Sequence, residues 1–160
     1  FELFGLGEQY ALCTRQLKEK YLALQQAHHP DRFVQSSIEV KDLADLTAAR
    51  INQAYRTLRD PISRAIYLLG LRGIDCQSES TVALSPEFLM EQMELREALA
   101  ECQQADDHKR LDAIRETVEN TLRDLDKMLA TQFDDPNIAR MAIHKMQFFT
   151  KLKDECEALD

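Results

Sequence analysis

The chain has 160 residues and a formal net charge of −8, and 44% of its residues are hydrophobic. This length is enough for one or two domains with a sizeable core. Only four glycines and four prolines stand among abundant Leu, Ala, Glu and Gln, which favours an almost entirely helical fold. No apolar run reaches the roughly 18 residues that a membrane-spanning helix needs, so we expect no contact with a membrane.

The charge is unevenly distributed along the chain. Residues 1–75 carry 10 basic and 9 acidic side chains, whereas residues 76–160 carry 10 basic and 19 acidic ones. The acidic second half argues against nucleic acid as a partner and favours two surfaces for different partners, although an acidic surface also serves solubility alone. We expect a cytoplasmic location. The missing signal peptide gives this expectation only weak support, because the first residue is Phe1 and not methionine.

The four cysteines, Cys13, Cys76, Cys102 and Cys156, are too far apart in sequence to form a Cys-x-x-Cys metal or redox pair. Cys102 and Cys156 fall on apolar helix faces, where a buried structural thiol is the favoured interpretation, although convergence of the cysteines in space stays open. Free thiols are typical of an intracellular chain. We therefore predict neither a metal nor a cofactor.

Two amphipathic segments separated by a polar loop dominate the first half of the chain. The first predicted helix, over about residues 12–28, has Leu17, Tyr21 and Leu24 at helical spacing. The second predicted helix, over about residues 41–58, has the apolar stripe Leu43, Leu46, Ile51, Tyr55 and Leu58. An antiparallel pair of such helices holds the connecting loop at one end.

The loop between these helices begins with His29-Pro30-Asp31. Proline lacks a backbone N–H and disfavours helical geometry in the residue before it, so the first helix is predicted to end near His28. The result would be an imidazole and a carboxylate side by side at an exposed helix end, with Phe33 returning to the core. The simpler interpretation is that the tripeptide only stops the helix, since three residues alone are a weak signal.

A cap-and-proline signal marks the next helix. Asp60 before Pro61 predicts a helix start, and the helix is expected to run to about Leu69 and to end at Gly70. The only plausible linker follows, over residues 71–84. Its apolar residues predict that it stays fixed to a surface.

Three long helices are predicted in the last part of the chain. Ser85-Pro86-Glu87 combines a cap, a proline and an acidic first turn, and opens a helix to about Ala105. The next helix carries a 3-4-4-3-4-4 apolar ladder made of Leu111, Ile114, Val118, Leu122, Leu125, Leu129 and Phe133. After a turn at residues 134–137, the last helix places Ile138, Ala142, Lys145, Phe149, Leu152, Cys156 and Leu159 on one side. Short turns between long helices predict an antiparallel bundle.

The helix that starts at Ser85 has apolar residues on two sides. At about 100° per residue, its core stripe consists of Phe88, Gln92, Leu95, Leu99 and Cys102. A second set of residues faces away from this stripe and mixes apolar side chains with glutamates. It consists of Met90, Met93, Glu94, Glu97 and Glu101, with Leu89 at its edge. Such a mixture indicates a partner-binding surface, and methionine suits it because its side chain adapts in shape. Alternatively, Leu89, Met90 and Met93 pack against the first half of the chain or against a neighbouring helix. Phe148 of the last helix either extends the patch or lies at the edge of the core.

Two sets of motifs carry a resemblance to known families. His29-Pro30-Asp31, the basic residues before it, Ile51-Asn52-Gln53-Ala54-Tyr55 and Leu58-Arg59-Asp60-Pro61 together resemble a J-domain, the module by which co-chaperones stimulate a DnaK-type ATPase. The segment from Phe88 to Leu99 (FLMEQMELREAL), with the ending Arg64-Ala65-Ile66-Tyr67-Leu68-Leu69, is similar to the HscB-type co-chaperones of iron–sulfur cluster biogenesis. This likeness covers essentially the whole chain.

The resemblance implies an all-α fold in which a J-domain over residues 1–70, an antiparallel helix pair plus short helices, is joined by residues 71–84 to an antiparallel three-helix bundle over residues 85–160. It also implies a co-chaperone and not an enzyme. Its partners would be a DnaK-like ATPase of the HscA type, whose ATP hydrolysis it stimulates, and an iron–sulfur scaffold protein of the IscU type, which it delivers. The implied chaperone-binding residues are His29, Pro30, Asp31, Lys18, Lys20 and Arg32. The implied scaffold-binding residues are Leu89, Met90, Met93, Glu94, Glu97, Glu101 and Phe148.

Two positions depart from the family pattern. His28 stands where an aromatic residue is usual, and Gln26 stands where a basic residue is common. The basic positions that remain are Lys18, Lys20 and Arg32, and this smaller number of charges predicts weaker binding to the ATPase. One alternative is a general J-domain co-chaperone for unfolded clients, against which the acidic, compact second half argues. The other is an enzyme that uses His28, His29 and Asp31 as a metal or acid–base site, although the further ligands that a metal site needs are missing.

Overall fold

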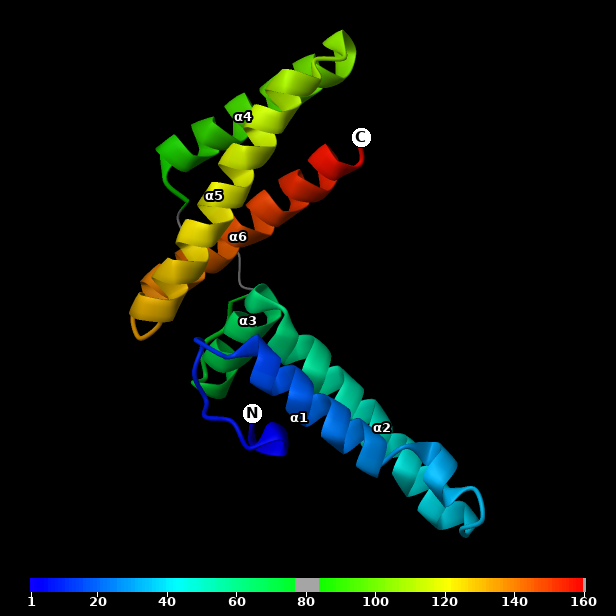
Figure 1. The fold of residues 1–160 in the computed structure, drawn as a ribbon. Coiled ribbons are helices and arrows are strands. Elements are labelled where there is room, and N and C mark those ends of the chain that lie inside the picture. The colour runs from blue at the N-terminus through cyan, green and yellow to red at the C-terminus, as the bar shows by residue number, and fades with distance from the viewer. Residues whose placement is uncertain (77–83, 160) are drawn as a thin grey trace. The chain divides into compact units, whose positions relative to one another are not determined.

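The computed structural model describes residues 1–76 and 84–159. These residues form helices and turns without any strand, which confirms the all-α fold class. The chain divides into two compact units, residues 1–72 and 73–160 (Figure 1). Residues 77–83 of the predicted linker lie outside the described residues. The prediction that the linker is fixed to a surface falls on these residues and stays a prediction. None of the described helices combines the length and the apolar character that crossing a bilayer requires.

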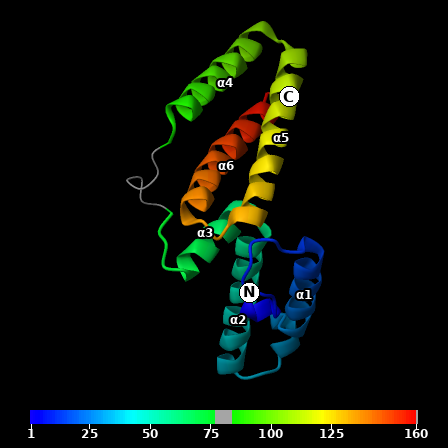
Figure 2. The ribbon, with the colours of Figure 1, turned by 90° about the vertical axis from the view of Figure 1, so that its left-hand side faces the viewer.

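The N-terminal unit is built on an antiparallel pair of helices, α1 (Thr14–Ala27) and α2 (Ile38–Arg59), which lie side by side in both ribbon views (Figures 1 and 2). A short 3-10 helix, η1 (Glu2–Phe4), precedes them, and a second one, η2 (Pro30–Phe33), lies in the loop between them. The helix α3 (Pro61–Leu71) packs against α2. The fully buried side chains of this unit include Leu17, Ile51, Leu58, Leu68 and Leu69.

The contact between α1 and α2 includes a specific polar and aromatic pairing. The Tyr21 hydroxyl donates a hydrogen bond to Asn52 Oδ1 over 2.8 Å, and the Tyr21 ring stacks on Tyr55 with 4.0 Å between the ring centroids. A stacked aromatic pair contributes about 0.5–1.5 kcal/mol beyond the area that it buries. Because the hydrogen bond is directional, the pairing fixes the rotation of α1 against α2, and with it the direction in which the connecting loop leaves.

Two details of the predicted helix pair are wrong. Helix α2 starts at Ile38 rather than near residue 41, because the Ser37 hydroxyl accepts a hydrogen bond from the backbone N–H of Val40 and caps the helix earlier. Leu43 and Leu46 do not belong to the buried stripe, since they are 66% and 63% exposed. The residue buried in that region is the small Ala44. Phe33 is half-buried, in partial agreement with its predicted return to the core.

The end of α3 also differs from the prediction. Asp60 caps the helix as expected, with its carboxylate accepting a hydrogen bond from the Ser63 N–H at 2.8 Å. Gly70 does not terminate the helix, which continues to Leu71. The left-handed backbone after the helix belongs instead to Gly73, with φ 74°.

A buried arginine ties α3 to the end of α2. Arg64 Nη1 donates a hydrogen bond to the Leu58 carbonyl oxygen over 2.8 Å, and its guanidinium lies 4.8 Å from the centroid of the Tyr10 ring. Carbonyls in the last turn of a helix lack intrahelical partners, so Arg64 satisfies one of them away from water. The arginine therefore joins α2, α3 and the segment before α1.

We expect Arg64→Met to lower the unfolding free energy of the N-terminal unit by about 2–3 kcal/mol, because the substitution leaves the buried Leu58 carbonyl without its charged donor. All four tyrosines of the chain lie in this unit and the chain has no tryptophan, so tyrosine fluorescence during urea denaturation reports on this unit alone. The exposed Arg59→Met is the control and should change stability by less than about 0.5 kcal/mol. Equal urea midpoints for the two variants would contradict the assigned role.

The C-terminal unit is an antiparallel bundle of three helices, α4 (Pro86–Ala105), α5 (His108–Gln132) and α6 (Pro136–Glu157) (Figure 1). Each begins at a side-chain cap. The Ser85 hydroxyl accepts from the Phe88 N–H, Asp107 from the Arg110 N–H, and Asp135 from the N–H groups of Asn137 and Ile138. The predicted start at Ser85 is confirmed. Helix α6 starts earlier than predicted, at Pro136 within the predicted turn over residues 134–137, because Asp135 caps it there.

The core of the bundle contains the apolar ladder predicted for α5. Leu111, Ile114, Val118, Leu125, Leu129 and Phe133 are buried, and Leu122 is half-buried. Helix α6 adds Ala142, Phe149, Leu152 and Cys156 as predicted, together with Ala139, Ile143 and Met146, which the predicted stripe omitted. Cys102 and Cys156 are buried thiols, in agreement with their interpretation. Cys76 is buried as well, and this burial raises the pKa of its thiol.

Candidate functional site

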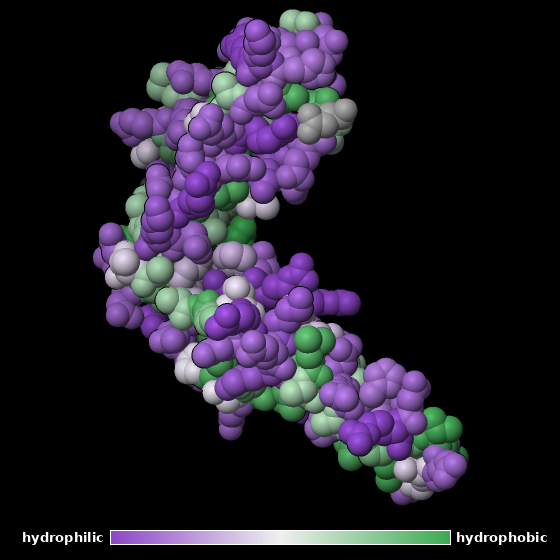
Figure 3. Space-filling model, in the orientation of Figure 1, coloured by the Kyte–Doolittle hydropathy of each residue, from purple (hydrophilic) through white to green (hydrophobic). Residues whose placement is uncertain are grey.

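The tripeptide His29-Pro30-Asp31 lies at the exposed end of the α1–α2 pair. Helix α1 ends at Ala27, His29 has extended backbone geometry with φ −63° and ψ 132°, and Pro30 takes the first position of η2. The side chains of His29 and Asp31 are 50% and 86% exposed. We refer to these three residues, together with Arg32, as the tip. In Figure 3, hydrophobic surface gathers at this end of the helix pair, where Val34 and Ile38 are among the exposed residues.

The imidazole and the carboxylate of the tip lie side by side. The backbone N–H of Asp31 donates a hydrogen bond to His29 Nδ1 over 3.2 Å, and Asp31 Oδ2 lies 3.5 Å from the same nitrogen. Because Nδ1 accepts a hydrogen bond, the proton of the neutral ring is on Nε2. The tip therefore offers an N–H donor and a carboxylate acceptor in a fixed mutual arrangement.

The basic residues that were predicted to accompany the tip have different environments. Arg32 Nη1 donates to the Gln26 carbonyl over 3.2 Å, which holds the guanidinium at the C-terminal end of α1. Lys18 is exposed. Lys20 lies about 200° around the helix from Lys18, and its ammonium donates to the Gly5 carbonyl over 3.1 Å. Lys18 and Lys20 therefore do not share a face, and Lys20 anchors the N-terminal segment.

The sequence prediction missed an apolar residue beside the tip. Leu22 is 48% exposed on the outer side of α1, away from the core. A shallow depression on this side is lined by Leu22, Gln25, Gln26, His29 and Arg32. The helical spacing of Lys18, Leu22 and Gln25 would have identified this face, because they lie within about 60° of one another and about 80–140° around α1 from the buried Leu17.

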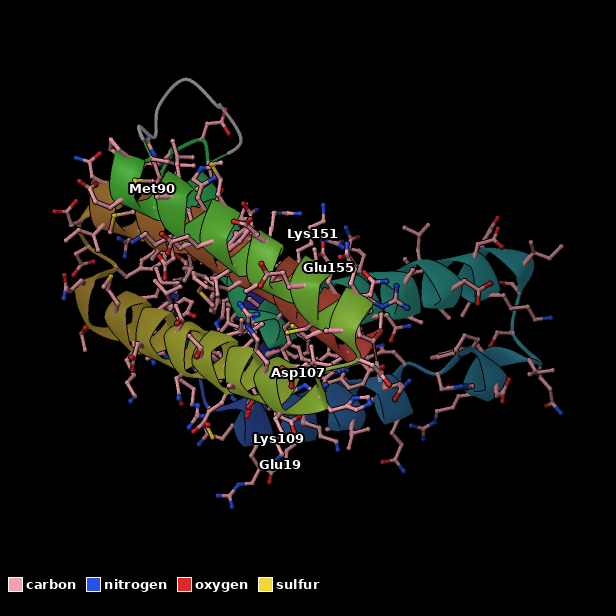
Figure 4. All side chains as sticks on the ribbon, turned by 90° about the horizontal axis from the view of Figure 1, so that it is seen from above. Glu19, Met90, Asp107, Lys109, Lys151 and Glu155 are labelled. Atoms are coloured by element: carbon pink, nitrogen blue, oxygen red, sulfur yellow. The ribbon has the colours of Figure 1, made fainter. Side chains whose placement is uncertain are left out.

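The second candidate surface is on α4. Leu89, Met90 and Met93 are 46%, 61% and 72% exposed, so they do not pack beneath the neighbouring helices of the bundle. Figure 4 shows Met90 on the outer side of α4. Apolar side chains with this much exposure, gathered on two turns of one helix, are typical of a protein-binding surface.

The three predicted glutamates of α4 are exposed but not equivalent. Glu101 Oε2 lies 2.7 Å from Arg110 Nη1 of α5, so its charge is already compensated within the bundle. Glu94 and Glu97 form no ion pair with any other residue in the described part of the chain. We refer to Leu89, Met90, Met93, Glu94 and Glu97 as the α4 surface.

Phe148 of α6 lies at the edge of the bundle core and is half-buried. Its ring makes edge contacts with Phe88 and Phe149, at centroid distances of 5.8 Å and 5.2 Å. The guanidinium of Arg96 stands over the same ring, with its Cζ atom 5.5 Å from the centroid. The ring therefore belongs to an aromatic cluster shared by α4 and α6.

The described residues include no group of three or more His, Cys, Asp or Glu side chains that is arranged to hold a metal ion. His28, His29 and Asp31 accordingly form no such group. The two candidate surfaces are suited to binding proteins, because both are exposed and combine apolar side chains with a few fixed charges.

The fold and these surfaces define a helical binding protein of two units. A family model described as the HSCB C-terminal oligomerisation domain matches residues 84–157. The co-chaperone protein HscB homolog of Cupriavidus taiwanensis is 40% identical over 163 residues, which cover 100% of this chain and 93% of the relative. The structure of the chaperone HscB from Vibrio cholerae is 40% identical with a TM-score of 0.85, and the match covers 99% of this chain and 94% of that one.

The crystal structure of human co-chaperone protein HscB is 28% identical and has a TM-score of 0.87, with 99% of this chain and 80% of that chain covered. The chain therefore belongs to the HscB family of co-chaperones. Its relatives are co-chaperones and not enzymes, which confirms the non-enzymatic prediction.

Proposed function

We propose that the chain connects a DnaK-like ATPase of the HscA type with an iron–sulfur scaffold protein of the IscU type in the cytoplasm, and so assists the maturation of iron–sulfur proteins. The N-terminal unit acts as a J-domain whose tip binds the ATPase and stimulates ATP hydrolysis. The α4 surface binds the scaffold. The observation that supports this proposal is that two exposed surfaces of different chemistry lie on two separate units of a chain that belongs to the HscB family.

Stimulation requires that the tip bind one state of the ATPase better than the other. A ligand can shift a conformational equilibrium only by its difference in affinity for the two states. A fixed donor and acceptor pair is suited to this task, because it fits one arrangement of partner groups and pays little entropy on binding. In the proposed mechanism, the Nε2 proton of His29 and the Asp31 carboxylate bind the hydrolysis-competent state of the ATPase.

In the proposed mechanism, the chain delivers the scaffold by holding it close to the ATPase. While the α4 surface holds the scaffold and the tip holds the ATPase, the scaffold reaches the peptide site of the ATPase at a raised effective concentration. The predicted chaperone-facing cations are few, and the hydrogen bonds of Lys20 and Arg32 to backbone carbonyls leave their charges in place. Because Lys18 and Lys20 do not share a face of α1, the expected electrostatic attraction to the ATPase is modest, and it is sensitive to salt.

Isothermal titration calorimetry against each partner separately, followed by ATPase assays with both partners present, tests the proposed function. We expect one-to-one binding to each partner, no competition between them, and more ATP hydrolysis with both than with either alone. A failure to bind the scaffold would overturn the proposal. Equal binding of unrelated unfolded proteins, in competition with the scaffold, would instead favour a general J-domain co-chaperone.

A further inference from the structure

The half of the α1–α2 pair that carries the tip has almost no core. Among residues 22–50, all of which the structure describes, Ala44 is the only buried residue, and the others are half-buried or exposed. One methyl group buries little apolar surface, so it does little to fix the rotation of one helix against the other. The large buried side chains of Leu17 and Leu58 lie near the start of α1 and the end of α2, away from the tip. Core packing alone therefore does not aim the tip.

A single polar contact connects the two helices ahead of the tip. Within the described residues, the hydrogen bond from the Tyr21 hydroxyl to Asn52 Oδ1 is the only side-chain hydrogen bond or ion pair between α1 and α2. The rings of Tyr21 and Tyr55 are stacked at 11° to each other, and such a stack leaves sliding movements open. The hydrogen bond, in contrast, weakens steeply when its angle changes. Tyr21 lies about 12 Å along the helix axis from His29.

The tip itself spans the two helices. His29 follows the C-cap of α1, whereas η2, which contains Asp31, packs against α2. The hydrogen bond from the Asp31 N–H to His29 Nδ1 therefore depends on the placement of α1 against α2. Arg32 also connects η2 with α1, through the Gln26 carbonyl, but its long exposed side chain adapts to a shift.

A small rotation of α1 is enough to disturb the tip. Turning the helix by about 20° moves a side-chain atom that is about 5 Å from the axis by about 2 Å. A movement of that size breaks a hydrogen bond of 3.2 Å such as the one between Asp31 and His29. The contact that prevents this rotation consequently controls the arrangement of the imidazole and the carboxylate.

We propose that Tyr21 and Asn52 are positioning residues for ATPase stimulation. Their hydrogen bond holds the rotation of α1 at which His29 and Asp31 pair, and neither residue needs to touch the ATPase. This inference rests on the proposed function, because it concerns the same tip. It assigns to the middle of the helix pair a part in the selection of the hydrolysis-competent state, about 12 Å from the groups that bind it.

Four variants isolate the hydrogen bond from the stack. Tyr21→Phe keeps the ring and removes the hydroxyl, and Asn52→Leu removes the acceptor at similar size. Asn52→Asp keeps an acceptor oxygen at the same position and is the conservative rescue. Tyr55→Phe is the matched control, because it removes the other hydroxyl of the stack, which forms no hydrogen bond with any described residue.

NMR spectra of the free chain test the link between this contact and the tip. We expect Tyr21→Phe and Asn52→Leu each to shift the backbone amide signal of Asp31. At mildly alkaline pH, where an imidazole is neutral, the ring nitrogen signals of His29 should move from the Nε2-protonated form toward an average of the two tautomers, because Nδ1 loses its donor. Asn52→Asp and Tyr55→Phe should leave these signals in place. Unchanged signals in Tyr21→Phe, or equal shifts in Tyr55→Phe, would overturn the proposal.

Steady-state ATPase assays with the purified chaperone measure the functional consequence. Maximal stimulation should fall about fivefold in Tyr21→Phe and in Asn52→Leu, a loss typical of one hydrogen bond. The chain concentration at half-maximal stimulation should change by less than about twofold, because the tip selects the state of the ATPase while the basic residues also contribute to affinity. The Tyr21→Phe/Asn52→Leu double variant should lose no more than either single variant, and Asn52→Asp should stay within about twofold of the unmodified chain.

A merely structural hydrogen bond gives a different result. It would lower the melting temperature of Tyr21→Phe and leave maximal stimulation by the folded variant unchanged, which would overturn the proposal. A thermal melt of each variant provides this comparison.

Failure of this inference is distinguishable from failure of the proposed function. If the unmodified chain does not stimulate the ATPase, the proposed function is wrong, whereas the spectra of the free chain still decide whether Tyr21 and Asn52 position the tip. If the unmodified chain stimulates and Tyr21→Phe stimulates equally well, only the positioning role is wrong.

Discussion

A His29→Gln variant is expected to lose stimulation of the ATPase completely, so that ATP hydrolysis falls to the rate of the chaperone alone. Glutamine has no ring to hold an acceptor against the Asp31 N–H and a donor on the opposite side, so the fixed arrangement of the tip is lost. Affinity for the scaffold should stay unchanged, because the substitution is in the other unit. Single-turnover ATP hydrolysis and calorimetry with the scaffold measure the two effects.

The neighbouring His28→Gln is the matched control for this experiment. His28 caps the end of α1 through its backbone N–H and is half-buried, whereas His29 is at the tip. Stimulation should therefore survive in His28→Gln, provided that tyrosine fluorescence shows a folded N-terminal unit. Normal stimulation by His29→Gln, or equal losses in both variants, would argue that the tripeptide only stops the helix.

The double variant Leu89→Ala with Met93→Ala is expected to weaken scaffold binding by about 2–3 kcal/mol, or about 30- to 140-fold. Truncating two apolar side chains that become buried in an interface removes roughly this much binding energy. Both residues are exposed in the free chain, so bundle stability should change by less than about 0.5 kcal/mol. Calorimetry with the scaffold and a thermal melt provide these values, and ATPase stimulation in the absence of scaffold should not change.

Leu43→Ala with Leu46→Ala is a control of the same chemistry. These leucines are exposed to a similar degree but lie on α2, in the N-terminal unit, so scaffold affinity should be unaffected. An equal loss of affinity in the two double variants would show that the effect comes from general surface hydrophobicity. If His29→Gln and the α4 double variant each impaired both functions equally, the assignment of two separate binding surfaces would be wrong.

The starts of α3 and α4 were predictable from the sequence, because a capping residue stands directly before a proline. Asp60 and Ser85 each accept a hydrogen bond from a backbone N–H in the first turn of the helix that follows. The cap of α2 at Ser37, which no proline follows, was missed, and Asp135 before Pro136 was taken for part of a turn. The end of α3 was mispredicted because Gly70 and Gly73 both suit a helix end, and only the tertiary structure selects between them.

The buried side of α2 was less predictable. Ala44, Ile51 and Leu58 repeat every seven residues on the buried face, but an alanine contributes little to an apolar pattern beside Leu43 and Leu46. The predicted stripe therefore included Leu43 and Leu46, which lie about 100° and 160° around the helix from Ala44. A preference for large apolar residues therefore misses a buried position that an alanine occupies.

The exposed residues of a candidate surface were predictable from the sequence where they all lie on a single helix. Projection of α4 identified Leu89, Met90 and Met93, all of which the structure places on the surface. Contacts between elements were not predictable, because no sequence spacing reports them. The hydrogen bond of Lys20 with Gly5, the ion pair of Glu101 with Arg110 and the contact of Arg96 with Phe148 are of this kind.

The ion pair between Glu101 and Arg110 restricts how the turn between α4 and α5 can evolve. The pair spans a turn whose residue Asp106 has left-handed backbone geometry, with φ 54°, and its 2.7 Å distance depends on the present length of that turn. An insertion or deletion there would separate the two partners and release an additional negative charge next to Glu97. Surface turns usually tolerate changes in length, but at this one we expect natural variants to keep the same number of residues.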